Sequence, residues 1–385
     1  MQRSLFTGLL AAALTAASLP AQQTAAFVIR LGQDTTSVER FTRGKDGWEV
    51  DQVGRVPRVL RRHAVVTLGP DGALRTADIT VTRVGGAAGG PPAQHILAAR
   101  AGDSITIEAH VDTNVRRNAN AVPAGAATPI ISGWVTYDGL AMRLFAGKGD
   151  SVRVPMYYLN SPDLSWVAVR RLGKDSVDIE TQFDRYHARV DKKGQILGLR
   201  PIKGTQQYSV ERVASVDLEA FVSAFAAKEA QGGAVGALSP RDTARATVGA
   251  ANLWIDYGRP TRRGRVIFGG VVPWGDVWRT GANAATQFST DKALRFGSAA
   301  VPAGKYTLWT VPTPTGWTLI INSETGQWGT EHHADKDLFK IPLSVTSSSP
   351  PVEKFTIHIA PGDNAGQIHF VWDTLVAQAD FTVAE

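Results

Sequence analysis

The chain has 385 residues, a formal net charge of +6 and no cysteine. Its length suffices for two domains of ordinary size. The absence of cysteine excludes disulfides, thiolate metal sites, cysteine nucleophiles and lipid attachment to an N-terminal cysteine. The basic residues are scattered in pairs such as Arg61-Arg62 and Arg170-Arg171. For an exported chain this pattern favours a surface near anionic envelope polymers, and we expect no nucleic-acid partner.

The N-terminus has the three parts of a secretory signal peptide. Arg3 supplies a positive start, residues 5–19 form an apolar run, and Ala21 precedes two glutamines. The run is shorter than the about 20 residues that a membrane helix needs. We therefore predict a signal peptide over residues 1–21 and a mature chain in the periplasm or outside the cell. We expect neither a lipoprotein nor a membrane span in the mature chain.

Residues 22–230 are predicted to form an antiparallel β domain. Residues 63–68 are predicted to form one strand and residues 74–81, which alternate around Ile79 and Val81, a second, on either side of the Gly-Pro-Asp-Gly turn at 69–72. A similar hairpin recurs over 187–199. Hairpins in series predict a curved, half-barrel-like sheet.

Glycine marks further breaks in this domain. Turns are predicted at residues 45–47 and at Asp138-Gly139, and residues 85–92 form a Gly/Pro loop. No Lys-Ser/Thr pair follows that loop, so it does not have the pattern of a phosphate-binding loop.

One helix is predicted in this domain, over residues 216–230. Asp217 can cap its N-terminus, and apolar residues from Leu218 to Phe225 recur at helical spacing. This apolar stripe should cover one face of the sheet. A glycine-rich linker is predicted over residues 231–244.

Residues 245–385 differ from the first domain in their many aromatic residues and short strand patterns. The expected strands are 253–257, 266–268, 305–311, 317–322, 354–359 and 366–372. Many short strands separated by Gly/Pro turns predict a β-sandwich or jelly-roll. The predicted fold class is therefore mainly β, with a half-barrel-like sheet and one packed helix followed by a sandwich.

The second domain carries a frame of motifs found in a known family. In order, they are Tyr257-Gly258-Arg259-Pro260, Val272-Pro273-Trp274-Gly275, Trp278-Arg279-Thr280-Gly281-Ala282-Asn283 and Gln327-Trp328-Gly329. This frame resembles the bacterial family catalogued as domain of unknown function 2911. The resemblance covers most of the second domain, and it implies a β-sandwich but no particular activity. Where the family has a tyrosine before an aspartate, this chain has Glu331-His332-His333.

The motif from Trp278 to Asn283 holds the first candidates for ligand contact. Arg279 offers a fixed fork of donors, and Asn283 offers both a donor and an acceptor. The predicted ligand-binding set is Arg265, Trp274, Trp278, Arg279, Asn283 and Trp328. Its aromatic walls and polar groups suit a glycan, a peptidoglycan fragment or a peptide. The alternative is structural, with the polar residues tying a loop and the tryptophans in the core.

Four arginines surround Gly264 in the second domain. They are Arg259, Arg262, Arg263 and Arg265. The cluster could bind a polyanion, or it could flank a solvated turn in which only Arg265 makes a specific ion pair.

A second candidate site is a group of histidines and carboxylates. His332, His333, Asp335 and Asp337 have side chains that bind divalent ions such as zinc. Successive side chains alternate along a strand, so the two histidines could share an ion only in a loop. This group supports an alternative function as a secreted hydrolase assisted by a metal. No other cofactor is expected.

A third function remains open from the first domain. Its curved sheet could make the protein an envelope carrier for lipid or an interaction module for an envelope partner.

In the second domain, His358 and His369 lie in two neighbouring expected strands and should pair across a hairpin.

Overall fold

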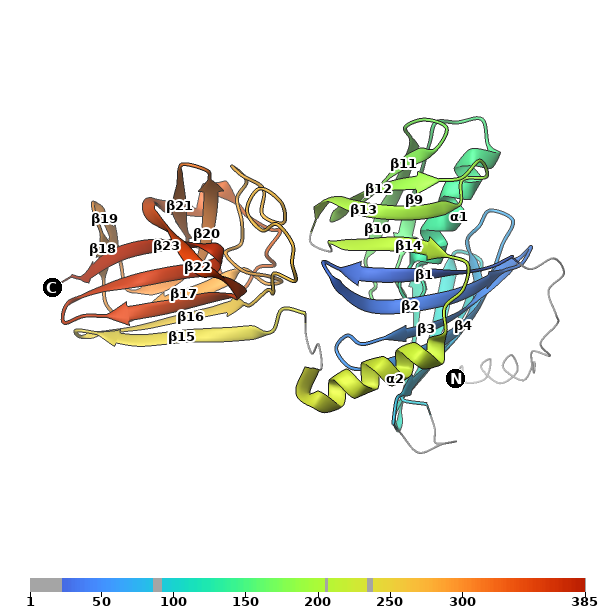
Figure 1. Cartoon of the computed structure of the whole chain (residues 1–385), viewed down its shortest axis with the longest axis horizontal. Coiled ribbons are helices and arrows are strands. Elements are labelled where there is room, and N and C mark those ends of the chain that lie inside the picture. The colour runs from blue at the N-terminus through green and yellow to red at the C-terminus, as the bar shows by residue number, and fades with distance from the viewer. Residues whose placement is uncertain (1–22, 86–91, 205–206, 234–237, 385) are drawn as a thin grey trace, which may run out of the picture.

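The computed structural model describes residues 23–85, 92–204, 207–233 and 238–384 (Figure 1). The predicted signal peptide lies outside these ranges, as do most of the Gly/Pro loop and part of the predicted linker. Two antiparallel sheets make up most of the described chain, and each has its own hydrophobic core. The mainly β fold class is confirmed.

The first sheet has fourteen strands. In chain order they are β1 (Gln23–Leu31), β2 (Asp34–Arg43), β3 (Gly47–Gly54), β4 (Leu60–Leu68), β5 (Leu74–Arg83), β6 (Gln94–Ala101), β7 (Ser104–Val111), β8 (Asn114–Ala121), β9 (Ser151–Tyr157), β10 (Leu164–Arg171), β11 (Ser176–Thr181), β12 (Asp184–Val190), β13 (Ile196–Gly204) and β14 (Tyr208–Val213). Across the sheet the order is β8-β7-β6-β5-β4-β3-β2-β1-β14-β13-β12-β11-β10-β9. The two hairpins predicted around residues 69–72 and 191–194 are confirmed as β4–β5 and β12–β13.

This sheet is open but strongly curved, with β8 and β9 at its two ends. Nδ2 of Asn120, on β8, donates a hydrogen bond to Oη of Tyr157, on β9, at 2.7 Å. Ala127 also forms an isolated parallel bridge with Met156. The two ends therefore approach each other without pairing as strands, and the half-barrel-like prediction holds.

Helix α1 (Trp134–Ala146) packs against the inner face of this curved sheet. Asp138 is 1% exposed and accepts hydrogen bonds from Arg43 at 3.0 Å and from Arg212 at 2.6 Å. The backbone N–H of Ile196 donates to the same carboxylate. The turn predicted at Asp138-Gly139 is wrong, because the aspartate is a buried anchor within a helix. A Cβ at Gly139 would lie 3.0 Å from the Arg43 guanidinium, so the glycine leaves room for that arginine.

Helix α2 (Leu218–Lys228) covers the opposite face of the sheet (Figure 1). Phe27 points into the inner core and its neighbour Val28 packs with Phe225 of α2, as alternation along a strand requires. Oδ1 of Asp217 accepts from the backbone N–H of Ala220 at 3.0 Å, which confirms the predicted N-cap. A short π-helical turn, η1 (Glu229–Gly233), follows.

The second sheet has nine strands and one short 3-10 turn. In chain order they are β15 (Arg241–Val248), β16 (Ala251–Gly258), β17 (Thr286–Thr290), β18 (Leu294–Phe296), β19 (Ala299–Val301), β20 (Gly304–Thr313), β21 (Gly316–Asn322), η2 (Ala334–Lys336), β22 (Asp337–Pro361) and β23 (Ala365–Val383). Across the sheet the order is β15-β16-β17-β20-β21-β22-β23-β18-β19. β15 begins inside the segment that the sequence analysis gave to the linker.

The second sheet folds back on itself at β22. Residues up to Leu343 of this strand pair with β21, and residues from Ser344 onward pair with β23. Tyr257 on β16 meets Phe355 on β22 edge to face, with ring centroids 5.7 Å apart, although three strands separate β16 from β22. The predicted sandwich is therefore confirmed.

One predicted strand of the second domain is absent. Residues 266–268 belong to a tight turn, in which the backbone N–H groups of Gly270 and Val272 both donate to the carbonyl of Ile267. Ile267 is buried, and this explains the apolar pattern that resembled a strand. No helix of the described ranges has the length and apolar character that a membrane crossing requires.

Candidate functional site

The predicted ligand-binding motif lies on a segment that runs beside β20. Trp278 and Thr310 exchange two backbone hydrogen bonds, at 2.7 and 2.8 Å, and the N–H of Gly275 donates to the carbonyl of Pro312. The segment thus continues the sheet beyond the first residue of β17, and neighbouring side chains alternate between its two faces.

Trp278 points into the core of the sandwich. It stacks with Trp372 at 5.9 Å between ring centroids and meets Phe355 at 5.0 Å. Its Nε1 donates to the carbonyl of Gly281 at 3.1 Å, so the indole N–H is satisfied internally. Trp278 is therefore part of a buried aromatic cluster and not a pocket wall.

Two residues of this loop adopt positive φ without being glycine. Thr280 has φ 50° and Asn283 has φ 63°. Such conformations cost of order 1 kcal/mol each and often occur at functional sites. Nδ2 of Asn283 donates to the carbonyl of Ser239 at 3.3 Å, and its own carbonyl accepts from the N–H of Gly329 at 3.0 Å. Asn283 thus fastens the loop to the segment around Gly329.

Arg279 lies under that segment with few partners. Its one hydrogen bond to a described residue runs from Nη1 to the carbonyl of Gly329, and at 3.4 Å it is long. Nε is buried and has no partner among the described residues. A Cβ at Gly329 would lie 2.0 Å from Cδ of Arg279, so only glycine permits this packing. Burial lowers the pKa of the Arg279 guanidinium, and the carboxylate of Asp184 opposes that effect.

Two tryptophans of the predicted set are exposed. Trp274 is 38% exposed and stacks on Phe268 at 6.0 Å, and Trp328 is 49% exposed. Trp328 forms a bridge with Ala284, next to the loop that carries Arg279. Both indoles therefore offer open faces on the motif-bearing segments.

The Arg279 loop also faces the first sheet. Nζ of Lys203, on β13, lies 3.9 Å from the carboxylate of Asp276. Asp184, on β12, is the carboxylate whose charge acts on Arg279. Phe183, which precedes Asp184, is 51% exposed. The loop thus stands where the two sheets meet.

Arg265 has a structural place in the arginine cluster. Its Nε and Nη2 donate to the carbonyls of Arg262 and Thr261 at 3.0 and 2.6 Å. Burial, with a smaller effect of the positive charge of Arg263, lowers the pKa of Arg265 to about 10. The prediction that Arg265 alone makes an ion pair is wrong. The pairs of this cluster are Arg259–Asp242, Arg262–Asp373 and Arg263–Asp34.

The predicted metal ligands separate into different contacts. Nε2 of His332 lies 2.8 Å from Oδ1 of Asp337, which also accepts from Nδ2 of Asn322. Among the described residues, no three of the four predicted ligands bring their ligand atoms within 4.8 Å of one another. The remaining contacts are His333–Glu324 at 2.7 Å and Asp335–Lys336 at 3.2 Å.

The predicted pairing of His358 and His369 is confirmed. The two rings stack with centroids 4.4 Å apart and an interplanar angle of 7°. Burial lowers the pKa of both imidazoles.

The sequence analysis missed a buried acid in the first sheet. Glu39, on β2, is 1% exposed and shares the inner face with Phe41. Ser132 donates to its Oε2, Gln52 approaches the same oxygen at 3.5 Å, and Oε1 has no partner among the described residues. Burial raises the pKa of Glu39 to about 7. Alternation with Phe41 was the signal that could have revealed it.

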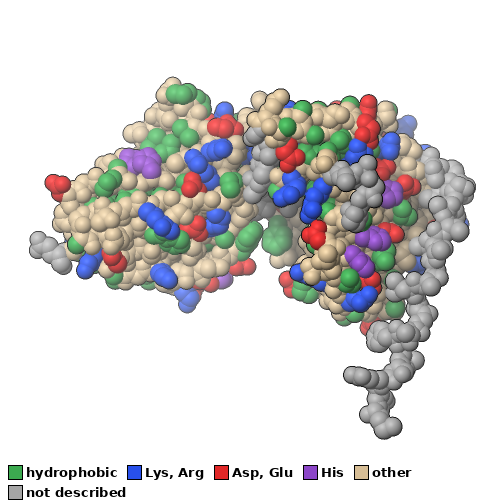
Figure 2. Space-filling model, turned by 90° about the horizontal axis from the view of Figure 1, so that it is seen from below, with side chains coloured by type: hydrophobic (Ala, Val, Ile, Leu, Met, Phe, Trp, Pro, Cys, Tyr) green, Lys and Arg blue, Asp and Glu red, His purple; other side chains and the backbone are tan. Residues whose placement is uncertain are grey.

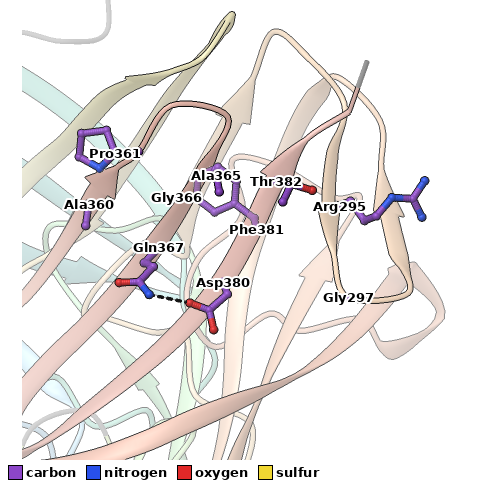
Figure 3. Close-up of a pocket in the computed structure, with 11 residues that line it drawn as sticks. Arg295, Gly297, Ala360, Pro361, Ala365, Gly366, Gln367, Asp380, Phe381 and Thr382 are labelled. Carbon is purple, nitrogen blue, oxygen red and sulfur yellow. Dashed lines mark hydrogen bonds between the residues drawn. The ribbon is translucent and has the colours of Figure 1, made fainter.

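A shallow hollow of about 540 Å³ lies at the outer edge of the second sheet (Figure 3). It is lined by the β22–β23 turn and by Arg295, Gly297 and Phe381. Nε2 of Gln367 donates to Asp380 at 2.9 Å on its floor. No residue of either predicted site lines this hollow.

Comparison with known families agrees with the predicted resemblance. Residues 239–381 match the profile of the family described as "Protein of unknown function (DUF2911)", and the first sheet lies outside the match. This part of the chain is therefore similar to that family, whose description assigns no function.

Two solved structures show limited similarity. One is a DUF1089 family protein from Pseudomonas aeruginosa, with 18% identity, a TM-score of 0.31, and coverage of 43% of this chain and 90% of the other. The second is a β-barrel-like protein of the domain of unknown function DUF1849 from Brucella abortus, with 9% identity, a TM-score of 0.33, and coverage of 50% and 94%. At these scores neither structure bears on the function. No curated protein matches the sequence.

Proposed function

We propose that this protein binds a polar ligand bearing a carboxylate, and that Arg279 is the residue that fixes it. The observation that carries the proposal is the state of the Arg279 guanidinium. Its Nε is buried without a partner among the described residues, and the one hydrogen bond that the guanidinium makes to them, from Nη1 to the carbonyl of Gly329, is 3.4 Å long. A buried cation with unused donors is unfavourable unless an anion completes its shell.

A carboxylate suits this guanidinium in geometry and charge. Two parallel N–H groups can hold both oxygens of one carboxylate, and such charge-assisted pairs are about twice as strong as neutral hydrogen bonds. The exposed indoles of Trp274 and Trp328 can cover the apolar faces of a sugar or a peptide. The ligand classes that combine these features are acidic glycans, peptidoglycan fragments and peptides.

Asn283 and Trp278 support this site indirectly. Asn283 fastens the Arg279 loop to Ser239 and Gly329, and Trp278 anchors the same loop in the aromatic core. Their role is to hold Arg279 in place before the ligand arrives, which reduces the free-energy cost of ordering on binding.

The same proposal includes export of the chain. It is supported by the N-terminal charge, the apolar run and Ala21 of the predicted signal peptide. Mass spectrometry of the protein from envelope fractions should give a mature N-terminus at Gln22. Recovery of the uncut chain from the cytoplasm would contradict export without affecting the binding site.

A thermal-shift screen tests the ligand class. The panel holds acidic oligosaccharides, peptidoglycan fragments, peptides, divalent metals and lipids. A ligand at 100 times its dissociation constant should stabilise the protein by about 2.7 kcal/mol. We expect a shift from a carboxylate-bearing ligand that Arg279→Ala abolishes. Arg245→Ala is the matched control, because Arg245 is an exposed arginine on β15 and should keep the shift.

Two other results would replace the proposal. A metal shift lost in the His332→Ala/His333→Ala variant would favour the hydrolase alternative. A shift from lipid that persists in Arg279→Ala would favour a carrier function of the first sheet.

A further inference from the structure

Three metal-ligating side chains gather on the outer face of the first sheet. Asp51 on β3 is paired in register with His63 on β4, and Glu49 lies two residues before Asp51 on the same face. One ligand atom from each residue lies within 4.8 Å of the other two. All three stand on paired strands, which hold their backbones in place.

The hydrogen bond between Asp51 and His63 sets the role of each imidazole nitrogen. Nδ1 of His63 lies 2.8 Å from Oδ1 of Asp51, which fits an N–H donated to the carboxylate. In the neutral ring Nε2 then carries a lone pair. Nε2 faces Oε1 of Glu49 at 4.0 Å. Two acceptors that face each other across such a gap favour a cation between them.

We propose that His63 and Glu49 bind a divalent zinc ion through Nε2 and Oε1, with Asp51 as the positioning residue. The sum of one Zn–N and one Zn–O bond is about 4 Å, which matches the gap. Glu49 is half-exposed, so rotation of its side chain can shorten the gap toward the tetrahedral separation. A carboxylate that holds the other nitrogen of a ligating histidine is a recurrent arrangement in zinc sites. Water would complete the coordination.

The surrounding charges favour a cation. Arg40 pairs with Asp51 at 3.0 Å, and Arg61 pairs with Glu219 of α2. Arg61 also acts on Asp51 through its charge. The three carboxylates and two arginines leave one net negative charge beside His63. A bound divalent ion therefore meets no excess of positive charge.

The same face offers matched controls for this site. His95 pairs with Asp78 at 2.8 Å, and His110 pairs with Glu108 at 2.7 Å. Neither pair has a third ligand atom within 4.8 Å among the described residues. Figure 2 shows histidine side chains beside acidic ones on the half of the molecule formed by this sheet.

Calorimetric titration of the chain with zinc alone tests the inference. We expect one saturable site that His63→Gln and Glu49→Gln remove and that His95→Gln and His110→Gln retain. Unchanged binding in His63→Gln, or no saturable binding by the unmodified chain, overturns the proposal. If His95→Gln lost zinc binding to the same extent as His63→Gln, the ion would lie at another cluster, and the proposal would be overturned too. Circular dichroism of each variant confirms that the sheet remains folded.

Asp51→Asn separates positioning from ligation. The amide cannot replace the charged acceptor for Nδ1, so the zinc dissociation constant should rise by about 10- to 100-fold without loss of the site. An affinity in Asp51→Asn equal to that of the unmodified chain would contradict the positioning role. This site lies on the first sheet and does not depend on the function proposed for Arg279.

Discussion

Arg263 and Asp34 form an ion pair that joins the two sheets. Arg263 belongs to the long loop after β16, and Asp34 begins β2. Arg55 reaches the other oxygen of Asp34 at 3.2 Å, and the N–H of Gln33 donates to the carbonyl of Arg263 at 3.1 Å. A Cβ at Gly32 would lie 2.1 Å from that carbonyl oxygen. The two sheets therefore meet at a closely packed contact with its own charges.

Asp34→Ala should loosen this contact. The change leaves Arg55 and Arg263, which are 8% and 10% exposed at their side chains, without their shared carboxylate. Because Asp34 itself is 37% exposed, we expect a loss of about 1–2 kcal/mol in the free energy of unfolding. Differential scanning calorimetry should show the unfolding of the two sheets separating. Asp335→Ala, at an exposed ion pair with Lys336, is the control and should change stability by less than about 1 kcal/mol.

Asp138→Asn should destabilise the first sheet more strongly. The carboxylate is 1% exposed and compensates both Arg43 and Arg212, so its loss leaves two largely buried cations. Removal of one partner from such a network costs about 3–5 kcal/mol. Urea unfolding measures the change. Glu211→Gln, at an exposed pair with Arg30, should stay within about 1 kcal/mol of the unmodified protein. Equal effects of the two variants would contradict the anchoring role of Asp138.

Glu39 should make stability depend on pH in an unusual direction. Its pKa in the fold is about 7, above the ordinary value of 4.5, because of burial. Between these values the folded state holds a proton that the unfolded state lacks. The contribution of Glu39 is thus complete below about pH 4.5 and is lost as the pH rises toward 7. The total loss is about 3 kcal/mol.

The Glu39→Gln variant isolates this contribution. Urea unfolding at several pH values should show the variant gaining stability relative to the unmodified protein between pH 4.5 and 7 and keeping that difference above pH 7. Glu180→Gln, at an exposed carboxylate on β11, is the matched control for the loss of one surface charge. A Glu39→Gln difference that does not vary between pH 4.5 and 7 would contradict the raised pKa of Glu39.

Substitutions at Asn283 should change the stability of the protein through backbone strain as well as through lost contacts. Asn283→Ala keeps a Cβ at φ 63° and removes the hydrogen bond to Ser239, so we expect a loss of about 1 kcal/mol or more. Asn283→Gly loses the same hydrogen bond but relieves the strain, and should be the more stable of the two. Thermal unfolding of both variants checks this order. If Asn283→Gly were the less stable variant, φ strain would not be the dominant effect.

Local sequence patterns were sufficient for the hairpins and for α2. The turns at residues 69–72 and 191–194 carry their own glycines, and Asp217 caps its helix through a neighbour three residues away. Each of these features depends on contacts close in the chain. They could therefore be predicted without knowledge of the fold.

Features that depend on distant contacts could not be predicted. α1 has Gly133 at its N-cap and no side-chain cap, so its start carries no local signal. Its Asp138-Gly139 pair has the sequence pattern of a turn, and the partners that bury Asp138 in a helix, Arg43 and Arg212, come from the distant strands β2 and β14. Trp274 and Trp278 lie four residues apart, and distant partners such as Phe355 and Trp372 make Trp278 a core residue. The sequence analysis selected Arg279 by residue type, but the buried Nε without a partner among the described residues is visible only in the folded chain.

Calorimetric titration with a charged and a neutral form of one ligand tests the central claim most directly. The ligand is a peptidoglycan fragment with a free carboxylate, compared with the same fragment amidated at that group. Amidation and Arg279→Ala should each weaken binding, and their effects combined should be no larger than either alone, because both remove one interaction. Equal binding of the two forms, or unchanged binding by Arg279→Ala, would contradict a carboxylate site at Arg279.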